Sequence, residues 1–146
     1  MTTTTAPADD PRWLALFIAW AAAFVSTLGA LFLGEVMGLR PCVLCWYQRI
    51  AMFPLVIVLG MGLLWADFRS ARYGLALAVP GGLVAVYHCL LYWGAVPKGL
   101  VPCGQGPSCT EGQLTVAGFI PIPVLSLVAF SIVIVLLSYA SKGTRE

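Results

Sequence analysis

Four long apolar stretches, joined by short connections, constrain the fold of this chain more than any other feature. A helix needs about 20 mainly apolar residues to cross the hydrocarbon core of a bilayer. Only helices and closed barrels satisfy every backbone polar group in lipid, and the stretches lack the alternating pattern of barrel strands. We therefore predict an all-α membrane protein, a four-helix transmembrane bundle. Its expected spans are residues 13–34, 46–65, 74–93 and 119–139.

The composition leaves no room for a separate soluble domain. Of the 146 residues, 60% are hydrophobic and 10% are charged, whereas soluble domains carry about 25% charged residues. We predict one transmembrane domain over residues 13–140, a disordered cytoplasmic N-terminus at 1–12 and a cytoplasmic tail at 141–146. Residues 1–10 carry no basic side chain, so the first stretch is expected to be a retained helix rather than a signal peptide. The apolar stretches predict membrane lipid as the surroundings, and because the basic residues are scattered and not clustered, we expect no nucleic acid as a partner.

The placement of charge predicts the orientation of the bundle. Four spans put both termini on one side of the membrane, with the connection 67–73, and the loops 35–45 and 94–118 on the other. Lys and Arg are in excess on the cytoplasmic side, and the side of the termini holds five of them against three. We therefore expect cytoplasmic termini and two outward-facing loops. The five are Arg12, Arg69, Arg72, Lys142 and Arg145, and the three are Arg40, Arg49 and Lys98.

Each outward loop carries a pair of cysteines. Cys42 and Cys45 form a CxxC pair at the start of the second span, and Cys103 and Cys109 lie in the long loop before the fourth. Disulfides persist in oxidising compartments outside the cytoplasm, so two outward dithiols indicate a relay of thiol–disulfide exchange. Exchange requires contact through a mixed disulfide. The chain between Trp93 and Cys103 is long enough to bring the two pairs together.

The position of the first pair favours a reactive thiolate, but metal binding is also possible. Unpaired N–H groups and the helix dipole stabilise a thiolate at a helix N-terminus. Arg49 lies one turn beyond Cys45, so we expect Cys45 to ionise readily. A CxxC pair is also half of a zinc site, which Cys103 and Cys109 could complete. An outward-facing metal-binding or metal-transport protein is therefore the alternative function, and an accessory subunit whose disulfides only hold loops together is another.

The third span contains a histidine next to a cysteine. Ionisable residues within a span are costly and are candidates for function. His88 is expected about two turns from the outer end of its span, where it could share a pocket with Arg49 close to Cys45. A packed, hydrogen-bonded histidine is the alternative. We expect Cys89 to be a small packing residue.

These residues resemble the DsbB disulfide-bond formation family, in its shorter, BdbC-type branch. The run RPCVLCWYQR at residues 40–49 looks like the family signature, and Tyr87-His88 and FIPIPVLSL at 119–127 look similar to its later motifs. The resemblance covers residues 13–140. Relatives of vitamin K epoxide reductase also combine four helices with a CxxC pair. In those proteins the CxxC follows the loop pair, so the order in this chain disfavours them.

The resemblance implies a thiol:quinone oxidoreductase of the bacterial cytoplasmic (inner) membrane. It would reoxidise an extracytoplasmic thioredoxin-like partner, DsbA-like or BdbD-like, and pass the electrons to ubiquinone or menaquinone. The catalytic residues would be the two cysteine pairs. By family analogy Cys103 forms the mixed disulfide with the partner, Cys109 resolves it, and Cys42 exchanges with this loop pair.

The resemblance also implies a quinone site. Cys45 would lie nearest the quinone, and Arg49 and His88 would bind beside it. A cationic Arg49 would stabilise both the thiolate and the negative charge that develops on the quinone. No residue is expected to bind a metal in this interpretation.

Overall fold

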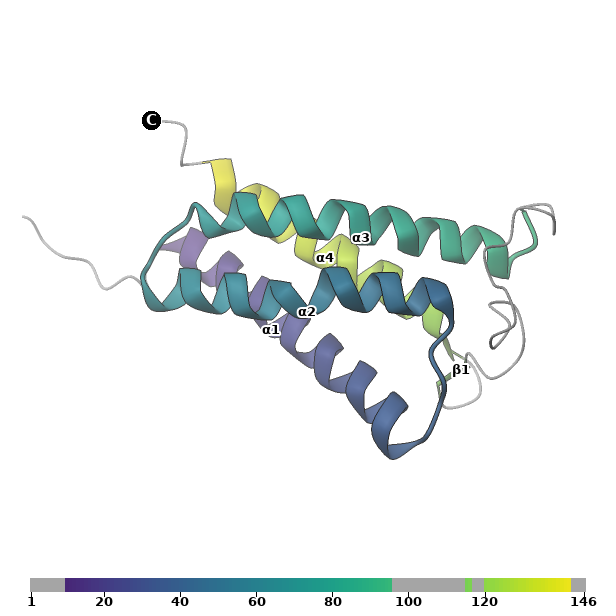
Figure 1. Cartoon of the computed structure of the whole chain (residues 1–146). Coiled ribbons are helices and arrows are strands. Elements are labelled where there is room, and N and C mark those ends of the chain that lie inside the picture. The colour runs from purple at the N-terminus through teal and green to yellow at the C-terminus, as the bar shows by residue number, and fades with distance from the viewer. Residues whose placement is uncertain (1–9, 96–114, 117–119, 143–146) are drawn as a thin grey trace, which may run out of the picture.

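The structure, a computed structural model, describes residues 10–95, 115–116 and 120–142, and its architecture is a bundle of four long helices (Figure 1). All four are long and apolar enough to cross a membrane, so the predicted all-α membrane fold is confirmed. Two short strands, β1 and β2, pair antiparallel just before the last helix. The elements are α1 (Pro11–Leu31), the π-helical turn η2 (Phe32–Val36), α2 (Val43–Leu64), α3 (Ser70–Tyr92), β1 (Thr115–Val116), β2 (Ile120–Pro121) and α4 (Ile122–Ser141).

The helices begin two to four residues away from the predicted starts, and local backbone and capping features account for the differences at α1, α2 and α4. Asp10 accepts a hydrogen bond from the Arg12 amide at 2.8 Å, so α1 already starts at Pro11. Cys42 caps α2 in the same way through its sulfur, which places Cys45 inside the helix. Pro121 is extended and ends β2, so α4 starts only after it.

The four helices form a closed ring around an apolar core. Helices α2 and α4 each pack against both α1 and α3. Small residues predominate where backbones approach closely, as is typical of helices that associate in lipid. A Cβ added at Gly81 would overlap the ring of Phe130 and lie 2.8 Å from the Cβ of Ala51. The buried core includes Leu16, Ala19, Leu55, Leu59, Ala78, Ala85, Phe130, Val133 and Leu137.

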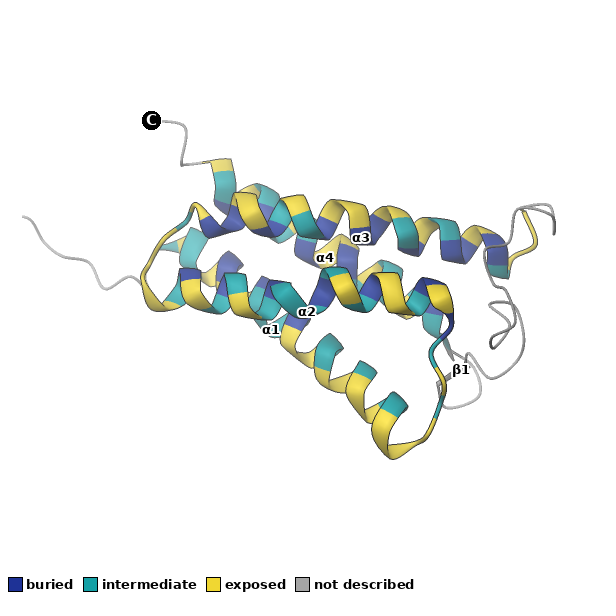
Figure 2. Ribbon diagram, viewed as in Figure 1, coloured by how far each residue is buried: buried dark blue, intermediate teal, exposed yellow. Residues whose placement is uncertain are grey.

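The lateral surface of the bundle, which faces away from the core, is apolar, as a lipid environment requires. Exposed positions lie on every helix (Figure 2). Many of them carry large apolar side chains, among them Val25 at 66%, Leu83 at 66% and Val135 at 67%. Soluble monomers rarely expose apolar surface on this scale. The chain is therefore an integral membrane protein.

Helix α1 leans away from its neighbours at the end of the bundle where α2 begins and α3 ends (Figure 1). We call this the cysteine end. All buried residues of α1 lie before Phe24, and none lies in η2. The second half of α1 therefore stands apart from α2 and α4, and this opening positions the candidate site.

Candidate active site

Cys42 and Cys45 lie together at the first turn of α2. Cys42 precedes the helix and is only 1% exposed, whereas Cys45 is half-buried. Their sulfurs are 2.8 Å apart, and the Cys45 amide donates to Cys42 Sγ at 3.3 Å. A disulfide can close from this arrangement by a small rotation of the side chains. The CxxC spacing thus brings the two thiols into reacting distance.

Hydrogen-bond donors converge on Cys42 and not on Cys45. Because the Cys45 amide already donates to Cys42 Sγ, the thiolate is best placed on Cys42 once the dithiol loses one proton, and the Cys45 thiol then donates to it. His88 Nε2 faces the same sulfur at 3.8 Å. The hydrogen bond from Cys45, together with that from His88, holds the pKa of Cys42 well below its ordinary value, although burial opposes the shift.

This arrangement differs from the sequence-based expectation, which gave the thiolate to Cys45. The reason lies in the helix start. Cys42 is the cap and receives a free amide, whereas Cys45 supplies that amide. The guanidinium of Arg49, which was expected to assist Cys45, binds a backbone carbonyl of α1.

His88 connects the dithiol to a residue that sequence reasoning missed. The ring is fully buried, and its Nδ1 lies 3.3 Å from Nε2 of Gln48. An amide nitrogen can only donate, so in this orientation of Gln48 we assign the ring proton to Nε2, the nitrogen that faces Cys42 Sγ. Gln48 is itself buried, at 6% exposure. Its position, one helical turn after Cys45 in a span where Arg49 is the only charged side chain, was the available signal.

His88 lies closer to the helix end than expected. Helix α3 ends at Tyr92, four residues later, so His88 is about one turn and not two turns from the end. It does not line the cleft described below. The ring lies behind Cys42 and Gln48. His88 therefore contacts Gln48, which lines the cleft together with Arg49, but does not line the cleft itself.

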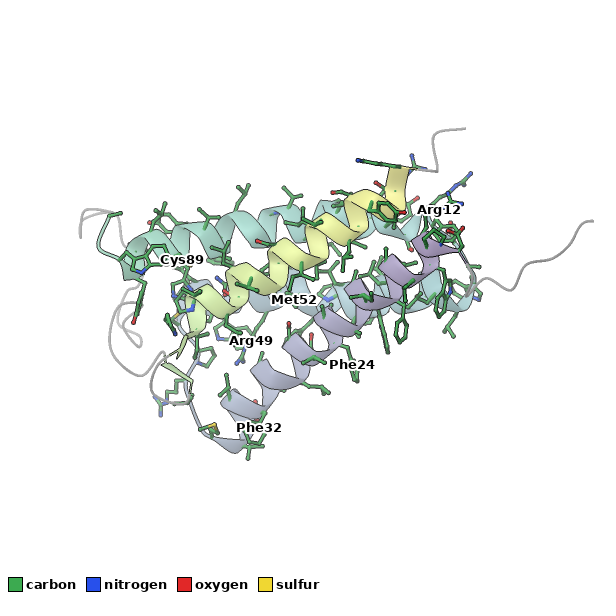
Figure 3. All side chains as sticks on the ribbon, turned by 180° about the vertical axis from the view of Figure 1, so that it is seen from behind. Arg12, Phe24, Phe32, Arg49, Met52 and Cys89 are labelled. Carbon is green, nitrogen blue, oxygen red and sulfur yellow. The ribbon has the colours of Figure 1, made fainter. Side chains whose placement is uncertain are left out.

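Arg49 reaches from α2 to the last turn of α1. Its Nη2 donates to the carbonyl oxygen of Ala30 at 2.7 Å, and its guanidinium carbon lies 5.8 Å from the ring centre of Trp46. A Cβ on Gly34 would stand 3.2 Å from the same nitrogen. Figure 3 shows the side chain in the space between α4 and the second half of α1. Among the described residues only Ala30 accepts a hydrogen bond from it, so further N–H groups can bind a ligand.

An apolar cleft of about 470 Å³ lies between α1, α2 and α4, directly beside Cys45. Sites for small organic molecules have volumes of about 300–1,000 Å³ and are mainly apolar with a few placed polar groups. This cleft has that character. Its polar side chains are Ser26 of α1, Cys45, Gln48 and Arg49 of α2, and Ser126 of α4.

The remaining cysteines divide into two cases. Cys103 and Cys109 lie outside the described residues, so their exchange with Cys42 stays a prediction. Cys89 is 2% exposed, as a packing residue would be.

A buried dithiol beside an apolar, arginine-bearing cleft, within four membrane helices, defines a membrane thiol oxidoreductase. The sequence model of the family described as "Disulfide bond formation protein DsbB" matches residues 11–140. The chain belongs to this family, which confirms the resemblance noted in the sequence and assigns it a role in disulfide formation.

Individual relatives agree with the family and include the BdbC-type proteins of Bacillus. A "Probable disulfide formation protein" of Metapseudomonas resinovorans is 48% identical over 133 residues, which cover 90% of this chain and 92% of that protein. "Disulfide bond formation protein C" of Bacillus subtilis is 36% identical over 135 residues, covering 92% and 97%. "Probable disulfide formation protein C 1" of Bacillus anthracis is 43% identical over 117 residues, covering 80% and 84%. No solved structure matches the chain.

The hydrogen bonds to Cys42 predict that its thiol loses its proton at a lower pH than an ordinary thiol. In a variant with Cys89→Ala, Cys103→Ser and Cys109→Ser, the ultraviolet absorbance of thiolate should rise at a pH below that of an ordinary thiol. Replacing Cys45 with Ala removes the strongest donor to Cys42, so the titration should move to higher pH. The matched control is Ser126→Ala, which leaves the sulfur environment intact. An unchanged titration after Cys45→Ala would contradict the assignment.

Proposed function

We propose that this protein oxidises a thioredoxin-like partner outside the cytoplasm and passes both electrons to a quinone of the bacterial cytoplasmic membrane. The observation that carries the proposal is the apolar cleft with Cys45 and Arg49 at its polar end. Membership of a disulfide bond formation family supports the thiol chemistry. The apolar cleft wall supports an electron acceptor that dissolves in lipid.

The residues of the cleft fit a quinone. A quinone is a flat ring with two polar oxygens and, in membranes, a long apolar tail. The guanidinium of Arg49 offers charged N–H donors for a ring oxygen, and the side chains of α1 and α4 offer an apolar wall for the rest. A bound quinone supplies an acceptor for two electrons and two protons.

The chain supplies position and proton control. Cys45 lines the cleft, whereas Cys42 lies behind it, so Cys45 is the sulfur placed toward the acceptor. As the dithiol becomes a disulfide, it loses two electrons and two protons. His88 holds a proton at Nε2 beside Cys42, and Gln48 fixes the ring by its contact with Nδ1. We propose that these two residues set the order in which the two thiols release their protons. His88 therefore acts on the dithiol.

The loop pair completes the relay in this proposal. The partner's dithiol reduces the Cys103–Cys109 disulfide and leaves as a disulfide itself. The loop dithiol then reduces the Cys42–Cys45 disulfide by exchange through a mixed disulfide. Each exchange conserves electrons and protons, so the only net oxidant is the quinone.

The orientation follows from charge in this proposal. Arg12, Arg69, Arg72 and Lys142 belong to the ends of α1, α3 and α4 that lie opposite the cysteine end. Since basic residues collect on the cytoplasmic side, the cysteine end faces outward. Residues 13–140 then form the single membrane domain, with both termini in the cytoplasm.

A reconstituted assay tests the proposal. The purified protein in lipid nanodiscs, with ubiquinone or menaquinone, should reduce quinone when a reduced thioredoxin-like protein is added, as followed by quinone absorbance. The same discs without the partner are the control. Oxidation of the partner without quinone reduction would overturn the proposed acceptor. One zinc ion held by all four loop cysteines would favour the metal-binding alternative.

We expect Arg49 to contribute to the affinity for the quinone. Arg49→Gln removes a charged hydrogen bond, which is worth about 1.5–3 kcal/mol, so the KM for quinone should rise by about tenfold or more. Arg40→Gln is the matched control, because Arg40 is an exposed arginine outside the cleft. Equal KM values for the two variants would show that Arg49 does not bind the acceptor.

A further inference from the structure

We propose that Cys42, Cys45 and His88, when the dithiol is reduced, form a binding site for a thiophilic divalent metal ion such as Zn²⁺. The Sγ atoms of Cys42 and Cys45 and one ring nitrogen of His88 all lie within 4.8 Å of one another. This donor set differs from the four loop cysteines considered from the sequence, because the third ligand comes from the membrane helix α3. The inference does not depend on the proposed quinone reaction.

The distances suit a tetrahedral ion after one small adjustment. Zinc binds sulfur at about 2.3 Å and imidazole nitrogen at about 2.0–2.1 Å, so neighbouring ligand atoms stand about 3.5–3.8 Å apart. Cys42 Sγ and His88 Nε2 are already 3.8 Å apart. The two sulfurs, at 2.8 Å, must separate by about 1 Å. Cys45 can provide this by side-chain rotation, since it is half-buried and borders the cleft.

Charge favours the ion in this environment. Two thiolates would place two negative charges in a poorly hydrated region, which is costly unless they are paired. A divalent cation neutralises both, and each coordinated thiol gives up its proton. A divalent ion with two thiolates carries no net charge, so the nearby positive charge of Arg49 does not repel it.

Gln48 provides the outer partner that a ligating histidine requires. When Nε2 binds a metal, the ring proton must move to Nδ1 and needs an acceptor. Gln48 lies 3.3 Å from Nδ1, and a turn of its amide presents the oxygen in place of the nitrogen. Cys45 lines the cleft, which leaves room for a water molecule as the fourth ligand.

The site would exist only in the reduced protein. Both sulfurs are consumed when the disulfide closes, so oxidation removes two of the three ligands. Metal binding therefore stabilises the reduced dithiol and opposes its oxidation. Added Zn²⁺ is expected to inhibit any reaction that proceeds through the disulfide.

X-ray absorption on the native chain tests the donor set. The full chain is reduced anaerobically, loaded with Zn²⁺ and washed, without quinone or partner in the sample. We expect one zinc per chain with two sulfur and two lighter ligands, one of which shows imidazole scattering. Four sulfur ligands, or no sulfur ligand, would overturn the proposal. Because quinone is absent, a failure of the proposed quinone reaction would leave this result unchanged.

A cobalt titration tests the part of His88. The variant with Cys89→Ala, Cys103→Ser and Cys109→Ser retains only Cys42 and Cys45 as thiols. Added Co²⁺ should produce a sulfur-to-metal charge-transfer band that Zn²⁺ removes and that is missing after the disulfide is closed. His88→Gln should weaken binding by about tenfold or more, whereas Ser131→Ala, at an exposed serine of α4 outside the cleft, should not. Equal binding by the His88→Gln variant, or no charge-transfer band in the parent, would overturn the site.

Discussion

Replacing Cys45 with serine is expected to reduce quinone reduction by a reduced partner to the rate without enzyme. The CxxC pair can deliver two electrons only by forming a disulfide, and a single thiol at Cys42 cannot do so. Cys42→Ser should have the same effect, because the sulfurs act as one unit at 2.8 Å. The measurement is the decrease of quinone absorbance in nanodiscs with an excess of reduced partner.

The matched control is Cys89→Ala, which removes a buried thiol of the same membrane region. It should retain turnover within about twofold, since conservative core changes of this size cost little stability. Unchanged turnover in Cys45→Ser would instead favour an accessory subunit whose disulfides only hold loops. A loss in all three variants would point to a general structural role of the cysteines.

The second large effect is expected at a glycine of the core. In Gly81→Ala the new methyl group would overlap the ring of Phe130 on α4 and press on Ala51 of α2. Phe130 is 1% exposed, so either its ring or the neighbouring helices must shift to accept the methyl group. Overpacking of a dense core costs about 1–3 kcal/mol, so the midpoint of thermal unfolding in detergent micelles should fall by several degrees.

Gly29→Ala is the matched control for this prediction. Gly29 also lies within a membrane helix, but a Cβ there meets nothing within 4 Å. Its unfolding midpoint should equal that of the native protein or exceed it slightly. Equal midpoints for the two variants would contradict the close packing of α2, α3 and α4 around Gly81.

Local sequence patterns predicted the architecture and part of the site. Four apolar stretches sufficed for the helix bundle, because the length and polarity needed to cross lipid are properties of each segment alone. The pairing of Cys42 and Cys45 was equally local, since residues three apart meet at a helix start. The boundaries were less certain because a cap such as Asp10 extends a helix beyond its apolar part.

The tertiary structure decided that His88 meets the dithiol and where the cleft lies. His88 is 46 residues from Cys42, and Arg49 reaches Ala30 across 19 residues. Such contacts depend on how α1, α2 and α3 pack, and no local pattern encodes that packing. The four apolar stretches therefore determined that the chain is a membrane bundle with a dithiol at one end. The lean of α1, and the burial of His88 against Cys42 and Gln48, turned that end into a candidate site.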